Sequence, residues 1–160
     1  MSMKMKIVAA FIEQLEKELA AMVQAARATH EAATHEESKA ENQYDTRGLE
    51  AAYLAGAQAK RAGEIDEALS LLKTAAFRNL GATDPVQATA LVSVDIEGKN
   101  SRLLVMPKGG ASRLHFEGQD YQIITPQSSL GEALIGLHAG ESGEFEVAGK
   151  LKEFEVLGVL

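Results

Sequence analysis

The sequence predicts an α+β fold, in which an N-terminal antiparallel α-helical hairpin of the coiled-coil type precedes an antiparallel sheet domain with one short helix. Three observations lead to this prediction. Apolar residues recur every three or four positions in the first half of the chain, no Gly or Pro interrupts residues 1–47, and 11 of the 14 glycines lie in residues 81–160. The rise in glycine content at residue 81 marks the change from helices to strands and turns.

The chain divides into three parts on this basis. Residues 1–80 are predicted to form the helical hairpin, residues 81–86 a linker, and residues 87–160 the sheet domain. With 160 residues, of which 46% are hydrophobic, the chain has enough apolar material to bury a core.

The first helix is predicted from about Lys6 to about Glu36, a length of about 45 Å at about 1.5 Å per residue. Its apolar side chains have the spacing of an amphipathic helix with a coiled-coil-like seam. They are Val8, Phe11, Leu15, Leu19, Met22 and Ala26. A helix of this length protrudes from a small protein.

The second helix is predicted to begin after Asp45 or Thr46, either of which suits an N-cap. Its apolar pattern continues to Ala76, and residues 79–81, followed by Pro85, are a helix stop signal because Gly81 can adopt the left-handed conformation. Two helices of similar length joined by a short polar segment form an antiparallel hairpin.

Six strands and a short helix over residues 129–136 are predicted in the sheet domain. Two pairs of strands flank the turn segments 97–100 and 117–120, which is the pattern of two β-hairpins. We therefore expect an antiparallel sheet. The predicted strands cover residues 90–96, 101–107, 112–116, 121–125, 144–147 and 151–159.

An acidic segment lies where the two helices are joined. Residues 31–50 carry six carboxylates against Lys39 and Arg47, which gives a net charge of −4. A solvated helical hairpin can carry such charges for solubility alone. The alternative is that these carboxylates, at the tip of the hairpin, have a functional role.

Composition excludes several classes of protein. The net charge of −7 and the pI near 5.1 argue against a module that grips a nucleic-acid backbone by itself. The absence of cysteine excludes disulfides, thiolate nucleophiles and cysteine zinc sites. The N-terminal apolar run is too short for a signal peptide or a membrane span, so we expect a cytoplasmic protein without membrane contact.

The histidines do not predict a metal site. His30 and His35 are five positions apart rather than the four of a zinc protease motif, so a helix does not place them on one face. His115 and His138 lie near no nucleophile pattern, and the chain has no Gly-rich phosphate loop. We therefore expect that the protein binds no metal or cofactor of its own and that it is not a free-standing enzyme.

Two stretches resemble the bacterial Gre transcript-cleavage factors (GreA/GreB-like elongation factors), and the resemblance covers essentially the whole chain. Glu41-Asn42-Gln43-Tyr44 is similar to the Gre tip signature of an acid, Leu, a polar residue and then Glu-Asn-x-x-Tyr. Residues 125–136, followed by 143–147 and 154–158, are similar to the Gre C-terminal pattern and its final strand. The shared order of these motifs carries the resemblance.

This resemblance implies a fold and a function. The sheet domain would be FKBP-like and would dock on RNA polymerase at the rim of the secondary channel, with Ser129, Leu130 and Gly131 as docking residues. The hairpin would enter the channel. The protein would act as a monomer and would contact nucleic acid only through the polymerase complex. Its tip carboxylates would act on the catalytic Mg²⁺ of the polymerase, which then cleaves its own backtracked transcript.

The tip residues are assigned position by position from the resemblance. Glu41 matches the second tip acid of the family, Asn42 the residue after it, and Tyr44 the tip tyrosine with one residue missing between. The first tip acid falls on Ser38 in this chain, and the nearest substitutes are Glu36 and Glu37, with Asp45 on the other side. We take Glu37, Glu41 and Asp45 as the acting carboxylates and Asn42 and Tyr44 as tip structure.

Three alternatives stay open. A Gre-fold regulator would occupy the same channel without promoting cleavage, and Ser38 at the first acid position favours that reading. A prolyl isomerase would need an apolar cradle rich in aromatic residues, for which the domain offers no Trp. A plain coiled-coil interaction protein would tolerate neutralisation of the tip.

Overall fold

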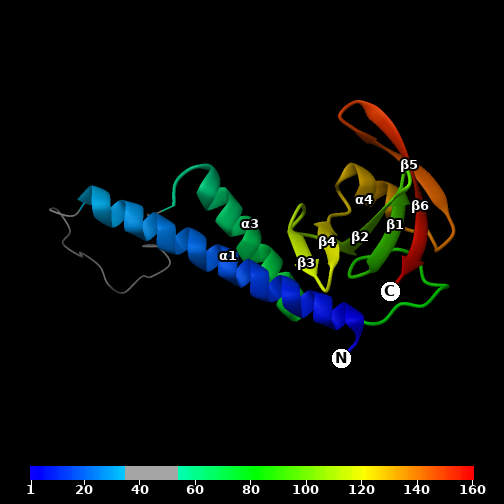
Figure 1. Cartoon of the computed structure of the whole chain (residues 1–160), viewed down its shortest axis with the longest axis horizontal. Coiled ribbons are helices and arrows are strands. Elements are labelled where there is room, and N and C mark those ends of the chain that lie inside the picture. The colour runs from blue at the N-terminus through cyan, green and yellow to red at the C-terminus, as the bar shows by residue number, and fades with distance from the viewer. Residues whose placement is uncertain (35–53) are drawn as a thin grey trace.

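The computed structural model describes residues 1–34 and 54–160 and shows a long helix projecting from a sheet domain (Figure 1). The helices are α1 (Met3–Thr34), α3 (Ala57–Thr74) and α4 (Ser129–Leu134). The strands are β1 (Leu91–Ile96), β2 (Lys99–Val105), β3 (Arg113–Phe116), β4 (Gln119–Ile124), β5 (Ser142–Val147) and β6 (Lys150–Val159).

Helix α1 confirms the first predicted helix as one uninterrupted element of 32 residues. At about 1.5 Å per residue it is about 48 Å long. The half nearer the sheet buries Ile7, Phe11 and Leu15 completely, at 0% exposure. The other half extends beyond the sheet domain (Figure 1). The predicted end near Glu36 lies outside the described residues.

Helix α3 is shorter than the sequence pattern predicts at both ends. The helix expected to run on from Asp45 or Thr46 is not continuous, because Leu54 and Ala55 are not helical and Gly56 precedes α3 with φ of 60°. Without a Cβ, glycine adopts this conformation at little cost, so the chain can change direction there.

The C-terminal end of α3 also differs from the predicted stop at residues 79–81. The helix ends at Thr74, and Ala75 is extended, while its backbone N–H donates to the Leu71 carbonyl oxygen at 2.8 Å. Phe77 then packs against the core under the helices, and Leu80 is buried in the core on the other sheet face. Burial of these two apolar side chains explains the early exit from the helix.

The six strands form one mixed sheet in the order β3-β4-β2-β1-β6-β5. The two predicted hairpins are confirmed, since β1 pairs with β2 and β3 pairs with β4 in antiparallel registers. The prediction of a wholly antiparallel sheet was wrong, because β2 and β4 are parallel. The chain leaves β2, forms the edge strand β3 and returns as β4 beside β2, which makes those two neighbours run the same way.

Each face of the sheet has its own hydrophobic core. On one face, α1 and α3 pack on β2, β3 and β4, and buried residues of the helices and the sheet form one cluster that includes Phe11, Leu69, Leu104, Leu114 and Ile123. On the other face, α4 packs with residues of β1, β2, β5 and β6. The base of the helical pair is therefore attached to the sheet by a shared core.

Lys4 is a buried cation at the base of α1, with 2% exposure. Its Nζ donates to the carbonyl oxygens of Arg78 at 2.8 Å and Leu160 at 2.9 Å, so it connects α1 to the segment after α3 and to the end of β6. Burial, together with the nearby Arg78 charge, lowers the pKa of Lys4 to about 8.

We expect Lys4 to make the fold more stable as the pH rises above 8. The unfolded chain keeps the Lys4 proton up to the ordinary pKa of 10.5, whereas the folded chain releases it near 8. Between these values the unfolded state binds more protons, so the free energy of unfolding rises with pH, by about 3 kcal/mol in total. Urea unfolding gives the free energy of unfolding of the wild type and of Lys4→Met at several pH values in this range. The difference between the two proteins should change with pH, because only the wild type carries the Lys4 amine. A difference that stays constant with pH would contradict it.

Candidate functional site

The site predicted from the sequence has two parts, and the structure describes one of them. Glu37, Glu41 and Asp45, with Asn42 and Tyr44, lie outside the described residues. The described part is the docking segment Ser129, Leu130 and Gly131, together with the helices that flank the acidic segment.

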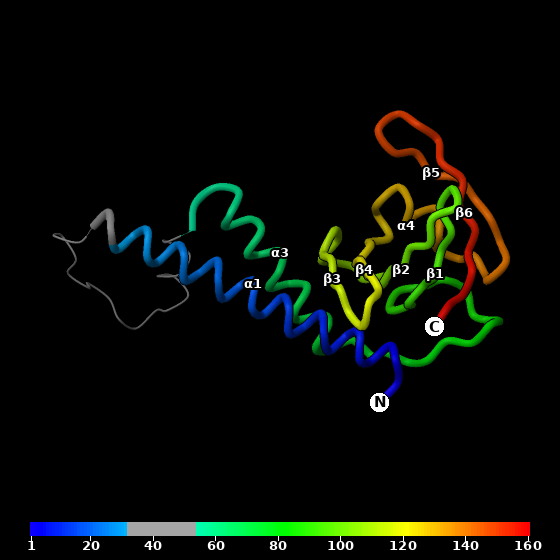
Figure 2. Tube along the Cα trace, in the orientation of Figure 1, coloured from blue at the N-terminus to red at the C-terminus, as the bar shows by residue number. Residues whose placement is uncertain are grey.

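The acidic segment follows directly from the free end of α1. Figures 1 and 2 show α1 extending away from the sheet and well past the start of α3. Two ion pairs join the helices. Arg61 lies 3.3 Å from Glu18, and Lys73 lies 3.7 Å from Glu16. Because these pairs are partly exposed, each contributes no more than about 1 kcal/mol.

Helix α4 positions the docking segment through a hydrogen-bonded N-terminus. Ser128 is the N-cap, and its Oγ accepts a hydrogen bond from the Gly131 backbone N–H at 3.1 Å and donates one to the Thr125 carbonyl oxygen at 2.7 Å. The Oγ of Ser129 accepts a hydrogen bond from the Glu146 backbone N–H at 3.2 Å. These bonds fix α4 against both the preceding loop and β5.

Ser129 and Leu130 line an apolar groove between α4 and the sheet. The groove has a volume of about 450 Å³, and its other lining residues include Ala111, Ile124 and Phe145. Val147 of β5 also lines it and is 43% exposed, which is unusual for a large apolar side chain in a polar hairpin. Sequence reasoning missed Val147, and no local pattern marks it, because its cross-strand neighbour is Lys150 and the exposed Leu151 lies opposite Glu146 on the other face of the hairpin.

Gly131 does not line this groove. The close packing of α4 against the preceding loop explains why residue 131 is a glycine. A Cβ at this position would lie 1.9 Å from the Thr125 carbonyl oxygen and 2.8 Å from the Ser128 Oγ. Only glycine lets α4 approach the preceding loop so closely. The structure therefore divides the predicted docking segment into two groove residues and one residue that seats the helix.

The histidines form exposed pairs with carboxylates. His115 Nδ1 lies 2.7 Å from Asp120 Oδ1, and His138 Nδ1 lies 2.9 Å from Glu141 Oε1. Hydrogen bonds from the backbone N–H and the ring of His138 lower the pKa of Glu141. Within residues 1–34 and 54–160, no group of three or more His, Cys, Asp or Glu side chains is placed to hold a metal ion. No helix in these ranges is long and apolar enough to span a membrane.

Comparison with known proteins gives matches among solved structures alone. No protein-family model and no curated protein matches the chain. Thermus aquaticus Gfh1 shares 22% identity at a TM-score of 0.38 over 94% of each chain. The GreA factor homolog 1 (Gfh1) of Thermus thermophilus shares 18% at 0.37, over 94% of this chain and 95% of that one. The transcription elongation factor GreA/GreB from Nitrosomonas europaea shares 19% at 0.34, over 59% of this chain and 77% of its own.

The chain is similar to Gre-type transcription factors. With TM-scores of 0.34–0.38 and identities of 18–22%, this likeness by itself carries no conclusion about activity.

Proposed function

We propose that the chain is a Gre-like transcription elongation factor that binds RNA polymerase through its secondary channel and stimulates cleavage of backtracked transcripts. One observation carries the proposal. The segment with the Gre-like tip signature Glu41-Asn42-Gln43-Tyr44 is joined to the free end of an uninterrupted 32-residue helix, whose base is packed on the sheet domain. This arrangement suits a finger that reaches a recessed active centre while the domain stays outside.

The chemistry follows from the ligands that Mg²⁺ prefers. Mg²⁺ takes carboxylate oxygens and keeps several waters, so a delivered carboxylate can hold a second metal ion or orient the attacking water. In this proposal Glu37, Glu41 and Asp45 act on the Mg²⁺ held by the polymerase. The factor has no cofactor of its own and is not itself an enzyme, because the polymerase hydrolyses the RNA.

The sheet domain would provide the docking surface. We assign it an FKBP-like fold, in which the groove lined by Ser129, Leu130 and Val147 contacts the polymerase at the channel rim. The apolar lining of this groove and the exposure of Val147 support docking there. In this proposal the factor acts in the cytoplasm as a monomer, and it meets nucleic acid only within the polymerase complex.

A second candidate function is supported by a specific observation. Ser38 occupies the position of the first tip acid of the family, and one residue is missing before Tyr44. If the remaining carboxylates do not converge on the metal, the chain would bind the same channel without stimulating cleavage. It would then regulate initiation or pausing.

Replacing Glu37 and Glu41 by Ala is expected to abolish most of the stimulation of transcript cleavage. The measurement is the rate of 3′ RNA release from an artificially backtracked complex of the cognate polymerase. Glu144→Ala with Glu153→Ala is the matched control, because it removes two exposed carboxylates from the sheet instead. The control should stimulate as the wild type does.

The outcomes separate the two candidates. Stimulation that the tip substitutions remove and the control keeps supports a cleavage factor acting through the tip. No stimulation, combined with competition against a known channel binder, supports the non-cleaving regulator. A protein that neither stimulates nor competes would refute the polymerase proposal as a whole.

A further inference from the structure

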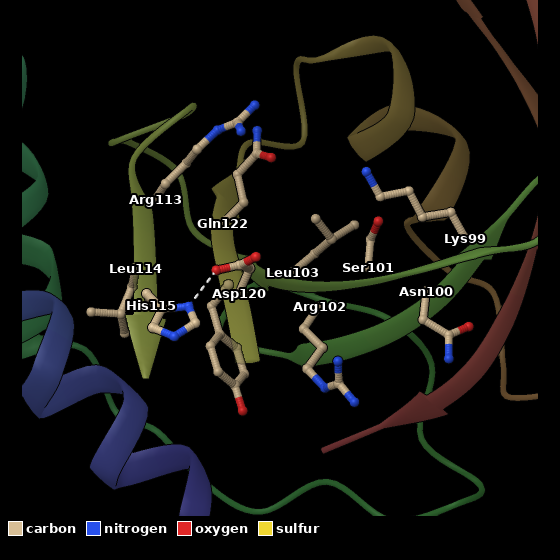
Figure 3. A pocket seen from close by; sticks show the side chains of 11 residues that line it. Lys99, Asn100, Ser101, Arg102, Leu103, Arg113, Leu114, His115, Asp120 and Gln122 are labelled. Carbon is tan, nitrogen blue, oxygen red and sulfur yellow. Dashed lines mark hydrogen bonds and ion pairs between the residues drawn. The ribbon is translucent and has the colours of Figure 1, made fainter. Parts of the chain in front are cut away.

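A notch lies between β2 and β4 at the end of the sheet where both strands begin (Figure 3). These parallel strands pair from Arg102, opposite Tyr121, to Val105, opposite Ile124. Before that point, Lys99–Ser101 pair with β1, and Gln119 and Asp120 pair with β3. The space between the strand starts is a hollow of about 420 Å³.

Three cationic side chains surround this notch: Lys99 and Arg102 from β2 and Arg113 from β3. Side chains alternate between the faces of a strand, so Lys99 and Arg102 lie on opposite faces. Figure 3 shows Lys99 and Arg113 directed to one side of the strands and Arg102 to the other. A ligand in the notch would therefore meet positive charge from both faces of the sheet.

Within residues 1–34 and 54–160, these three cations have no ion-pair partner. Arg61, Lys73 and Lys108, in contrast, each pair with a carboxylate. The chain has 23 acidic and 16 basic residues, so carboxylates are in excess. Asp120, whose Oδ1 lies 2.7 Å from the His115 ring, also lines the notch and offsets one of the three positive charges, so cations stay in excess there. Three unpaired cations around one hollow are thus unexpected for a solvated surface in an acidic protein.

We propose that this notch binds the phosphate groups of a nucleotide. Arginine guanidinium groups match phosphate oxygens in bidentate geometry. Ser101, Asn100 and Gln122 line the same hollow and add neutral hydrogen-bond donors. The volume falls in the range that holds small ligands.

Isothermal titration of the full chain with ATP, in a low-salt buffer without phosphate, tests the proposal. It does not depend on the polymerase proposal, since the free protein is measured. Arg102→Gln with Arg113→Gln should weaken ATP binding at least tenfold. Lys150→Gln with Lys152→Gln removes the same charge from β6 and should leave binding within about twofold of wild type, because neither lysine lines the notch. Circular dichroism checks that both double variants are folded.

Further titrants identify the source of the phosphate. Inorganic phosphate that competes with ATP supports a site for the phosphate group itself. A short single-stranded RNA that competes with ATP supports the same chemistry with a nucleic-acid source. Three results would overturn the proposal: no ATP binding, equal loss in both double variants, or a hexaglutamate peptide that binds as tightly as ATP.

Discussion

Replacing Phe11 by Ala is expected to lower the free energy of unfolding by about 3–5 kcal/mol, and to do so for the helices and the sheet together. Phe11 is 0% exposed on α1. Its cluster contains Ile65 and Leu69 of α3 as well as Leu104 and Leu114 of the sheet. The cavity left by alanine would therefore open at the contact between the helices and the sheet.

Urea unfolding followed by two observables measures this loss. Circular dichroism reports mainly on the helices, and amide resonances of β2 and β4 report on the sheet. Both should shift to lower urea by the same amount, because one core joins the two parts. Leu157→Ala, at a site that is 46% exposed on β6, is the matched control and should cost much less. Loss of helical signal at a urea concentration where the sheet stays intact would show that the two parts unfold separately.

The sequence predicts α1 correctly because its evidence is local. A long periodic apolar pattern without glycine or proline leaves a helix as the consistent solution. The two β-hairpins are predictable for the same reason, since residues 97–98 and 117–118 form tight turns between alternating strands. Neither result requires knowledge of distant contacts.

The features that were predicted wrongly depend on such contacts. Helix α3 ends at Thr74 because Phe77 packs partly buried against one core and Leu80 is buried in the other, and both cores are built from other parts of the chain. The parallel pairing of β2 with β4 depends on where the β3–β4 hairpin docks. Periodicity within a segment specifies a strand but not its neighbour.

In the candidate site, too, some residues can be found from a local sequence motif and others depend on distant contacts. The family resemblance suggested Ser129 and Leu130 as docking residues, a role that stays a prediction, and the structure places both on an apolar groove. It did not identify Val147, whose place on that groove depends on how β5 packs beside α4. The notch at Lys99, Arg102 and Arg113 combines residues of β2 and β3, which follow each other in the chain but are separated in the sheet by β4, so no local motif marks it.

Gly131 offers the sharpest distinction between a docking residue and a packing residue. Gly131→Ala is expected to cost at least ~3 kcal/mol of stability, at the upper end for overpacking, since the new Cβ would meet backbone rather than a flexible side chain. The clashing groups are the Thr125 carbonyl oxygen at 1.9 Å and the Ser128 Oγ at 2.8 Å. The second group is also the N-cap of α4, so relief of the clash would break the hydrogen bond from the Gly131 N–H.

Thermal and urea unfolding of Gly131→Ala and Gly63→Ala provide the test. Gly63 lies inside α3, where a Cβ would meet nothing within 4 Å beyond the backbone of its own helix. Alanine there should therefore raise stability by about 0.5–1 kcal/mol through helix propensity. If the change from glycine to alanine lowers stability at position 131 and raises it at position 63, packing requires Gly131. If Gly131→Ala instead folds as stably as the wild type and loses only its binding to RNA polymerase, the residue acts in docking, and the close approach of α4 to Thr125 is not required for folding.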